Sequence, residues 1–342
     1  MGPKTIAWPH LATKNPAPCR ALLTPRAPSE LAGSALELTV RRYTRREALA
    51  GLAVAARAAD TAKASNYVDA HVHVWTPDTV SFPHDKRRNG RPVPPVSFTP
   101  EQLLTLARPS GVSRIVLIQM SFYGTDNSYM LDALKRYPTV FSGVGILDHQ
   151  APGVREEMTR LAALRVRGYR ITPGVETSTW LDSPGMQTMW RCGAEKRIAM
   201  CPLIGPDAID SVSRMCARFP DTPVVIDHMA RIGASSEIRQ ADVRALCALA
   251  RQRNVHVKVS AFYALGNKQY PYTDLIPLIR SLYDAYGPER LMWASDSPFQ
   301  VQAPHTYAGS IELVRDRLDF LSGEDREWLL RKSGERVFFS HN

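Results

Sequence analysis

The sequence predicts a single-domain (β/α)8 TIM barrel, an α/β fold, and three observations predict it. Eight short β-branched runs alternate with longer stretches of helical periodicity between residues 67 and 295, a pattern typical of a parallel sheet built from βα units. The chain has 342 residues, enough for one barrel of about 250 residues and an appendage. Ionisable residues follow the ends of several runs, where barrels place their functional side chains.

Each predicted element follows from a local pattern. The predicted strands are Tyr67–His73, Arg114–Gln119, Phe141–Leu147, Gly168–Ile171, Ile198–Leu203, Pro223–His228, Val255–Ser260 and Arg290–Ser295. The predicted helices are Thr99–Arg108, Tyr129–Arg136, Val154–Leu164, Met186–Glu195, Pro206–Phe219, Gln240–Arg253 and Leu275–Tyr286. Thr99 and Gln102 have capping-box spacing, with Pro100 in the first helical turn. The Pro-rich segment Pro83–Pro95 fits neither pattern, so we expect a loop there, at the end of the barrel where function is concentrated.

The chain divides into a leader, residues 1–64, and the barrel domain, residues 65–342. The formal net charge is +10, and the leader supplies most of it, with 10 Lys or Arg against 4 Asp or Glu. Since the barrel domain has neither an arginine-rich stripe nor a nucleic-acid motif, we expect no nucleic-acid partner. No apolar run reaches the roughly 18 residues of a membrane span, so we also expect no integral membrane association. Barrels occur as monomers and as larger assemblies, so no oligomeric state is predicted.

The end of the leader has the layout of a signal peptide. Arg45 and Arg46 precede the short apolar run Ala48–Ala56, and Ala64 ends a small-residue sequence suited to cleavage. This layout resembles a twin-arginine export signal, which implies a periplasmic or secreted protein that is folded before export. The alternative is that the two arginines open an amphipathic helix and the protein stays in the cytoplasm.

The cysteines indicate neither a redox motif nor a structural zinc site. No CxxC pair or zinc-finger spacing is present, and a chain of this length needs no disulfides to hold its core. We therefore interpret these residues as buried thiols: Cys19, Cys192, Cys201, Cys216 and Cys247.

The first predicted strand carries an unusual polar pattern. Asp69, His71 and His73 alternate with Val68 and Val72, so period-two geometry places the three polar side chains on one face. Burying such a face without a partner is unfavourable. Two imidazoles two residues apart at the end of a strand can bind one metal ion or polarise one substrate.

Two later strands change abruptly from aliphatic to ionisable residues where they end. The sixth predicted strand runs into Asp227 and His228, and the eighth runs into Asp296. Once the barrel closes, Asp296 lies beside the first strand, where its carboxylate can ligate a metal or accept a proton from water. The alternative for Asp296 is a helix N-cap just before Pro298.

These motifs together resemble the amidohydrolase-related family of metal-dependent TIM-barrel hydrolases, over residues 65–340. The matching segments are Asp69-x-His71-x-His73, Asp227-His228-Met229-x-Arg231, Ser295-Asp296-x-Pro298, Gly124-Thr125-Asp126-Asn127 and Val257-Lys258-Val259-Ser260. The last two look particularly like the branch that contains 2-pyrone-4,6-dicarboxylate lactonase and sugar-lactone hydrolases. The resemblance implies hydrolysis of a carboxylated or sugar-derived lactone.

The resemblance also has implications for a metal cofactor. It implies His71, His73 and Asp296 as ligands of zinc or manganese if a metal is bound. Family members with tightly bound zinc usually add a histidine at the end of the fifth strand, where this chain has Cys201. The lactonase branch includes metal-independent enzymes, so Cys201 favours it over the metal-dependent decarboxylases of the family.

Basic and aromatic side chains complete the predicted site. Arg170 ends the fourth strand, Lys258 lies in the seventh, and Arg231 follows the sixth. The guanidinium group of arginine can bind a carboxylate through two parallel N–H donors. We therefore expect these three residues and Tyr123 to bind a small molecule that is anionic or a lactone. A structural ion pair is the alternative for the basic residues, and aromatic packing is the alternative for Tyr123 and for Tyr263.

A mechanism follows from the three strand ends. Asp296 takes a proton from water, the water attacks a lactone carbonyl, and His71, His73 and His228 polarise that carbonyl. A non-oxidative decarboxylase on the same scaffold is the first alternative. A periplasmic binding protein without catalysis is the second, although a binding protein has no need of a base such as Asp296.

Overall fold

Eight parallel strands form one sheet in the order β1 to β8 in the computed structural model, which describes residues 66–86 and 95–340. The strands are β1 Tyr67–Val72, β2 Val112–Ile118, β3 Phe141–Gly145, β4 Val166–Ile171, β5 Ala199–Pro202, β6 Val224–Ile226, β7 Val255–Val259 and β8 Leu291–Trp293. Each consecutive pair is parallel. The predicted (β/α)8 barrel is confirmed, whereas the predicted leader and its predicted export signal lie outside the described residues.

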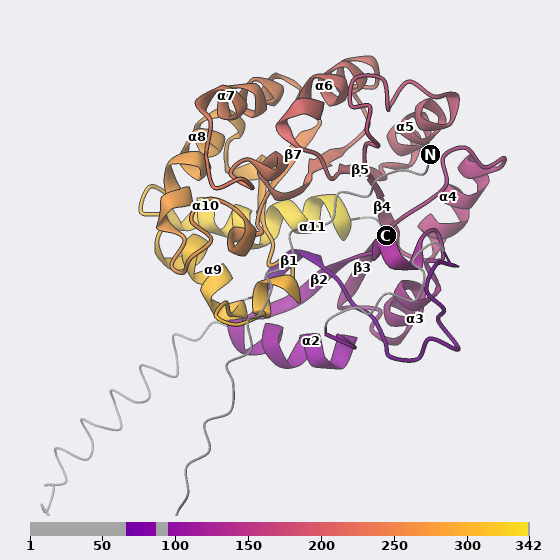
Figure 1. The fold of residues 1–342 in the computed structure, drawn as a ribbon, viewed down its shortest axis with the longest axis horizontal. Helices are drawn as coiled ribbons and strands as arrows, with labels where there is room; N and C mark the ends of the chain where they lie inside the picture. Colours follow the sequence, from indigo (N-terminus) through magenta and orange to yellow (C-terminus); the bar gives the residue numbers. More distant parts are fainter. Residues whose placement is uncertain (1–65, 87–94, 341–342) are drawn as a thin grey trace, which may run out of the picture. The chain divides into compact units, whose positions relative to one another are not determined.

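Helices follow the strands and form a ring outside them (Figure 1). The helices between strands are α2 Pro100–Ala107, α3 Ser128–Arg136, α4 Val154–Ala163, α5 Pro184–Lys196, α6 Ile209–Arg218, α7 Gln240–Ala248 and α8 Ile276–Tyr286. The predicted capping box of α2 is present, because the Thr99 side chain accepts from the Gln102 amide and the Gln102 side chain accepts from the Thr99 amide. Segments after β8 that the sequence analysis did not predict are α9 Tyr307–Asp316, α10 Gly323–Glu327, η11 Trp328–Lys332 and α11 Ser333–Phe338.

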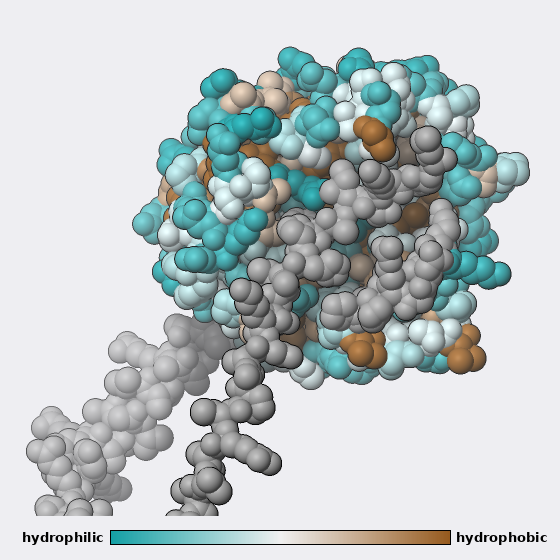
Figure 2. All heavy atoms as spheres, viewed as in Figure 1, coloured by the Kyte–Doolittle hydropathy of each residue, from teal (hydrophilic) through white to brown (hydrophobic). Residues whose placement is uncertain are grey.

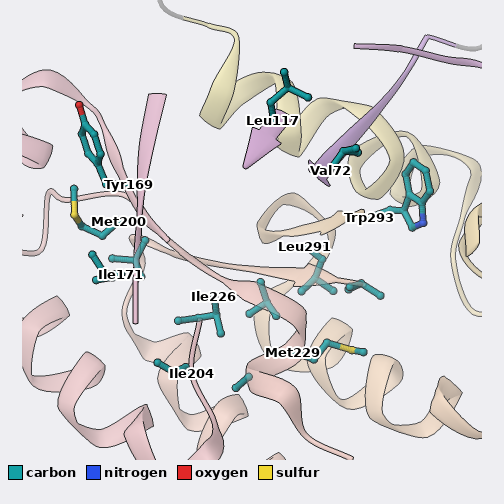
Figure 3. Packing of buried hydrophobic residues seen from close by; sticks show 14 of the residues in the cluster. Val72, Leu117, Tyr169, Ile171, Met200, Ile204, Ile226, Met229, Leu291 and Trp293 are labelled. Carbon is teal, nitrogen blue, oxygen red and sulfur yellow. The ribbon is translucent and has the colours of Figure 1, made fainter. Parts of the chain in front are cut away.

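Two apolar clusters pack on the two faces of the strands. The larger one lies between strands and surrounding helices and includes Leu117, Tyr169 and Trp293 (Figure 3). The smaller one fills the barrel interior, where Val337 and Phe338 of α11 pack against strand residues. Helix α11 therefore covers the end of the barrel at which the strands begin, and the opposite end is left for the site.

The barrel closes between β8 and β1 through backbone hydrogen bonds and one carboxylate. The His73 amide donates to the Ser297 carbonyl at 2.8 Å, and the Asp296 amide donates to the His71 carbonyl at 2.9 Å. Asp69 contributes its side chain: one oxygen accepts from the Ser295 amide at 2.9 Å. Its other oxygen accepts from the Tyr307 hydroxyl of α9 at 2.7 Å. Asp69 thus completes the seam between first and last strands.

The prediction that Asp69 shares a face with His71 and His73 is therefore wrong. The register of β1 shifts between Asp69 and Val72, so the strict alternation is interrupted. Ala70 packs in the interior cluster, which turns its neighbour Asp69 outward toward α9. Burial raises the pKa of Asp69 to about 6, in keeping with a structural carboxylate held by neutral donors.

The described residues at the rim of one face of the protein are mostly polar. The rim of the face in Figure 2 is largely hydrophilic, and hydrophobic side chains on it are scattered. The described helices include none with the length and apolar character needed to cross a bilayer.

His256 on β7 makes the stability of the fold depend on pH. Burial, together with the positive charges of Arg290 and Arg336, lowers the pKa of His256 from its usual value of 6.5 to about 4. The unfolded chain then binds a proton that the folded chain excludes, so stability is lost as the pH falls from 6.5 toward 4. The loss attributable to this residue is up to about 3 kcal/mol.

Replacing this imidazole with an uncharged side chain is expected to flatten the acid side of the stability profile. The Tm of H256Q relative to wild type should rise as the pH is lowered from 6.5 to 4, measured by thermal unfolding at several pH values. Parallel curves for the two proteins would contradict the assignment.

Candidate active site

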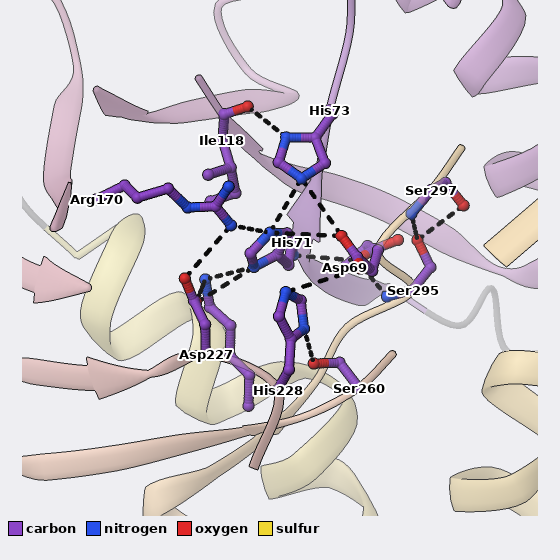
Figure 4. Close-up of polar contacts among 12 residues, drawn as sticks. Asp69, His71, His73, Ile118, Arg170, Asp227, His228, Ser260, Ser295 and Ser297 are labelled. Carbon is purple, nitrogen blue, oxygen red and sulfur yellow. Dashed lines mark hydrogen bonds and ion pairs between the residues drawn. The ribbon is translucent and has the colours of Figure 1, made fainter. Parts of the chain in front are cut away.

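The carboxyl ends of β1, β6 and β8 bring His71, His73, His228 and Asp296 into one buried cluster. Oδ1 of Asp296 lies 3.3 Å from Nε2 of His73 and 3.6 Å from Nε2 of His71. Its Oδ2 lies 3.7 Å from Nε2 of His228. Figure 4 shows the imidazoles of His71 and His73, at the end of β1, converging with that of His228, which follows β6. All four predicted catalytic residues therefore meet, although they span 225 positions of the sequence.

The backbone is locally strained where two of these side chains leave their strands. His228 has φ 52° and Asp296 has φ 61°, and both lie in the left-handed region that residues with a side chain seldom adopt. The sixth and eighth strands consequently end at Ile226 and Trp293, earlier than predicted. Such strain is characteristic of functional sites, where it aims a side chain away from the regular strand direction.

Hydrogen bonds fix which nitrogen of His73 carries a proton. Its Nδ1 lies 2.8 Å from the carbonyl oxygen of Ile118, so Nδ1 must be the donor. Burial lowers the pKa of His73, and the neutral ring then presents a bare lone pair at Nε2.

His71 adopts the same arrangement. Burial, reinforced by Lys258, holds the pKa of His71 well below its usual value, so the ring is neutral. Nη2 of Arg170 lies 2.7 Å from Nε2 of His71, and a guanidinium can only donate. Nε2 therefore accepts from Arg170, while Nδ1 lies 3.3 Å from Oδ1 of Asp227 and 3.2 Å from Nζ of Lys258.

Three acceptor atoms consequently point toward one another. They are Nε2 of His71, Nε2 of His73 and Oδ1 of Asp296, all within 4.8 Å of one another. Oδ1 of Asp296 is buried and lacks a hydrogen-bond partner in the described part of the chain. Imidazole nitrogen and carboxylate oxygen are ligands that zinc and manganese accept. The donor set therefore fits the predicted divalent metal.

Cys201 does not join this set. Its side chain packs in the apolar interior cluster, and burial raises the pKa of the thiol to about 12. A neutral thiol is a poor metal ligand. The interpretation of Cys201 as a buried thiol is confirmed; Cys192 and Cys216 are buried too, while Cys247 is partly exposed and Cys19 lies outside the described residues.

Asp296 and His228 each have a further partner. The Tyr263 hydroxyl donates to Oδ2 of Asp296 at 2.8 Å, and Nδ1 of His228 lies 2.8 Å from Oγ of Ser260. Burial by itself would raise the pKa of Asp296, but the neighbouring His228 and His73 outweigh it and hold the pKa well below its usual range. Burial also lowers the pKa of His228 to about 4. At neutral pH the site holds an ionised carboxylate among neutral imidazoles.

A buried ion network lies beneath this cluster. Nζ of Lys258 is 3.0 Å from Oδ1 of Asp227, and Nη2 of Arg170 is 3.4 Å from Oδ2 of the same carboxylate. Burial alone would raise the pKa of Asp227, but the charges of Lys258 and Arg170 lower it. Nζ of Lys258 also lies over the ring of Phe338. Lys258 therefore takes part in a buried ion pair, the alternative given for it, and its role in substrate binding stays a prediction.

The role of Asp227 in this ion network was not predicted. Asp227 was expected at the ionisable end of the sixth strand without a role of its own, although an acidic side chain at a strand end inside a barrel is itself a signal of a buried partner. The partners Lys258 and Arg170 lie on two other strands, so their pairing could not be read from sequence spacing.

Comparison with known proteins supplies an independent observation. A family model described as Amidohydrolase matches residues 68–339, from the second residue of β1 to just after α11. The chain belongs to the amidohydrolase family.

Relatives of this amidohydrolase include two enzymes named for lactones. It is 28% identical to an L-fucono-1,5-lactonase of Burkholderia ambifaria, over 70% of this chain and 82% of that protein. It is also 28% identical to a 4-sulfomuconolactone hydrolase of Rhizobium radiobacter, over 67% of this chain and 75% of that one. A solved structure from Pseudomonas putida, described as a candidate 2-pyrone-4,6-dicarboxylic acid hydrolase, matches with a TM-score of 0.69 and 26% identity, over 81% of this chain and 99% of that chain.

Tyr123 and Arg231 are the remaining predicted substrate-binding residues of the amidohydrolase. The Tyr123 hydroxyl accepts from the Thr76 amide at 3.3 Å, and its ring packs against His84 and Phe122. Packing, the alternative weighed above, is the role that these contacts give Tyr123. Arg231 is half-buried, and burial lowers its pKa.

The family segment Gly124–Asn127 also has a structural role here. The side-chain Nδ2 of Asn127 donates to the Ile146 carbonyl at 2.9 Å, and its Oδ1 accepts from the backbone N–H of Ile146 at 3.0 Å. Gln119 donates to the carbonyl of Asp126. This segment therefore ties the loop after β2 to the end of β3.

Proposed function

We propose that this amidohydrolase opens a lactone ring by attack of water, with Asp296 as the proton acceptor. One observation carries the proposal: Oδ1 of Asp296 is buried, ionised and unpartnered in the described part of the chain, and it faces the two imidazoles of β1. Tyr263 holds the other oxygen, so the carboxylate is fixed in one orientation. A base positioned in this way contributes about 10²- to 10⁴-fold to a reaction rate.

The reaction balances without an added reagent. The water oxygen bonds to the lactone carbonyl carbon while Asp296 takes one water proton. The resulting tetrahedral intermediate expels the ring oxygen, and Asp296 returns the proton to that oxygen. The product is a hydroxy acid, and Asp296 is regenerated as a carboxylate.

The developing oxyanion needs a donor or a cation, and the imidazoles of β1 offer neither by themselves. Because Nε2 of His71 and of His73 are acceptors, our prediction that these rings polarise the carbonyl directly is revised. Arg170 and His228 are the groups suited to direct donation. A divalent metal held by His71, His73 and Asp296 would supply Lewis-acid polarisation and a more acidic bound water.

The basic side chain at the site favours an anionic substrate. Nε of Arg170 is buried and without a hydrogen-bond partner among the described residues, so this N–H is available to a ligand. An arginine fork binds a carboxylate or sulfonate through two N–H groups. Two of the matched proteins are named for substrates with such groups, which supports a carboxylated lactone; a sugar lactone is the neutral alternative, as in the third.

The first test is a lactone panel assayed on the purified protein. L-Fucono-1,5-lactone, 4-sulfomuconolactone and 2-pyrone-4,6-dicarboxylate should be offered to chelated and to zinc-supplied samples, with acid release followed in a pH-stat. We expect turnover of at least one, with preference for the anionic lactones. Release of CO2 from carboxylated aromatic compounds, with no lactone hydrolysed in either sample, would favour the decarboxylase instead.

A further inference from the structure

The Arg170 guanidinium lies against an atom that a metal ion would need. Its Nη2 is 2.7 Å from Nε2 of His71, and that nitrogen is one of the three converging ligand atoms of the candidate metal site. The arginine side chain is 9% exposed and its carboxylate partner Asp227 is fully buried. The contact therefore belongs to the interior of the site.

One imidazole nitrogen cannot serve both partners. An imidazole nitrogen that accepts has a single lone pair, and the Arg170 N–H already uses the one at Nε2 of His71. Zinc binds an imidazole nitrogen at about 2.0–2.1 Å along that same lone pair. The two occupants are both cations, so mutual repulsion adds to the competition for the nitrogen.

Arg170 has partners to which it can withdraw. Its Nη2 lies 3.4 Å from Oδ2 of Asp227, a contact that does not depend on His71. Its Nε is buried without a partner among the described residues, so the guanidinium is not held in place by a full set of hydrogen bonds. A modest rotation therefore exchanges the His71 contact for others.

We propose that Arg170 and a divalent metal ion compete for Nε2 of His71. The guanidinium group of Arg170 then occupies part of the metal site, and a metal ion binds more weakly because it must displace this group. This inference concerns metal binding alone, and it stands or falls independently of which bond the enzyme hydrolyses.

Removing the competing charge is expected to tighten metal binding. The dissociation constant for Zn²⁺ should be measured on the full chain by competition with a chromophoric chelator, for wild type, R170M and the matched control R167M. Arg167 lies on the same strand and donates to the Ala162 carbonyl at 2.6 Å, so R167M removes an equal charge outside the site. We expect R170M to bind zinc at least ten-fold more tightly and R167M to stay within two-fold of wild type.

Zinc binding by R170M that is no tighter than that of R167M would overturn the proposal. A second measurement uses only the wild-type protein and so does not depend on whether a variant folds. In crystals soaked with Zn²⁺, Nη2 of Arg170 should lie beyond hydrogen-bond distance, about 3.5 Å, from Nε2 of His71. Zinc bonded to Nε2 with the guanidinium still in contact would also overturn it.

Discussion

D296N is expected to lower kcat for lactone hydrolysis by about 10³-fold while leaving the protein folded. The amide cannot accept the proton that the attacking water releases, so the tetrahedral intermediate does not form at a useful rate. Asparagine keeps an oxygen for the Tyr263 hydroxyl, and the side chain keeps its size. Steady-state kinetics with circular dichroism and thermal unfolding of the same preparations measure both effects.

A surface variant serves as the control for this loss. Asp284 forms an exposed ion pair with Arg280 at 2.9 Å, so D284N should retain the kcat and Tm of wild type. Turnover by D296N above a tenth of the wild-type value would exclude Asp296 as the base. An unfolded D296N protein would instead make Asp296 a structural residue.

Removing the buried carboxylate beneath the site is expected to produce the largest loss of stability. D227N leaves Lys258 and Arg170 buried with no ionised partner in the network, and breaking a buried pair in this way costs about 3–5 kcal/mol. At about 2–4 °C per kcal/mol, the Tm should fall by about 10 °C. Thermal unfolding of the metal-free proteins measures the change.

A double variant tests whether D227N loses stability because it leaves Lys258 without an ionised partner or because it disturbs packing. K258M removes the second member of the Lys258–Asp227 pair, so the double variant D227N/K258M should recover part of the stability that D227N loses. A double variant less stable than D227N, or a D227N protein within 2 °C of wild type, would mean that the network contributes little. D284N again serves as the control, because losing this exposed charge should change the free energy of unfolding by about 0.5 kcal/mol or less.

Much of the fold and the main catalytic candidates could be predicted from local patterns. Aliphatic runs that end in His228 and Asp296, and the His71-x-His73 pair, mark strand ends, and parallel strands of a barrel end on the same side. Chemistry-bearing residues at those ends must therefore gather. The cluster of four follows from this topology without knowledge of any distance.

Residues whose role depends on a partner across strands could not be predicted in the same way. Lys258 was expected to bind substrate, but the register of β6 against β7 places it beside Asp227. Asp69 was expected to face the site, but a register shift in β1 turns it to the seam with β8. The protonated nitrogen of His73 is set by a carbonyl on β2, a strand whose sequence gives no hint of it.

The sequence by itself thus determined the alternation of strands and helices and the catalytic end of the barrel, because periodicity and composition are local properties of the chain. Only the tertiary structure decided which lone pairs converge, which charges pair and which cation reaches His71. Those outcomes depend on strand register and on distances of about 3 Å between residues far apart in the chain. A change of about an ångström in such a distance makes or breaks a hydrogen bond or a buried ion pair. No sequence pattern specifies distances to that precision.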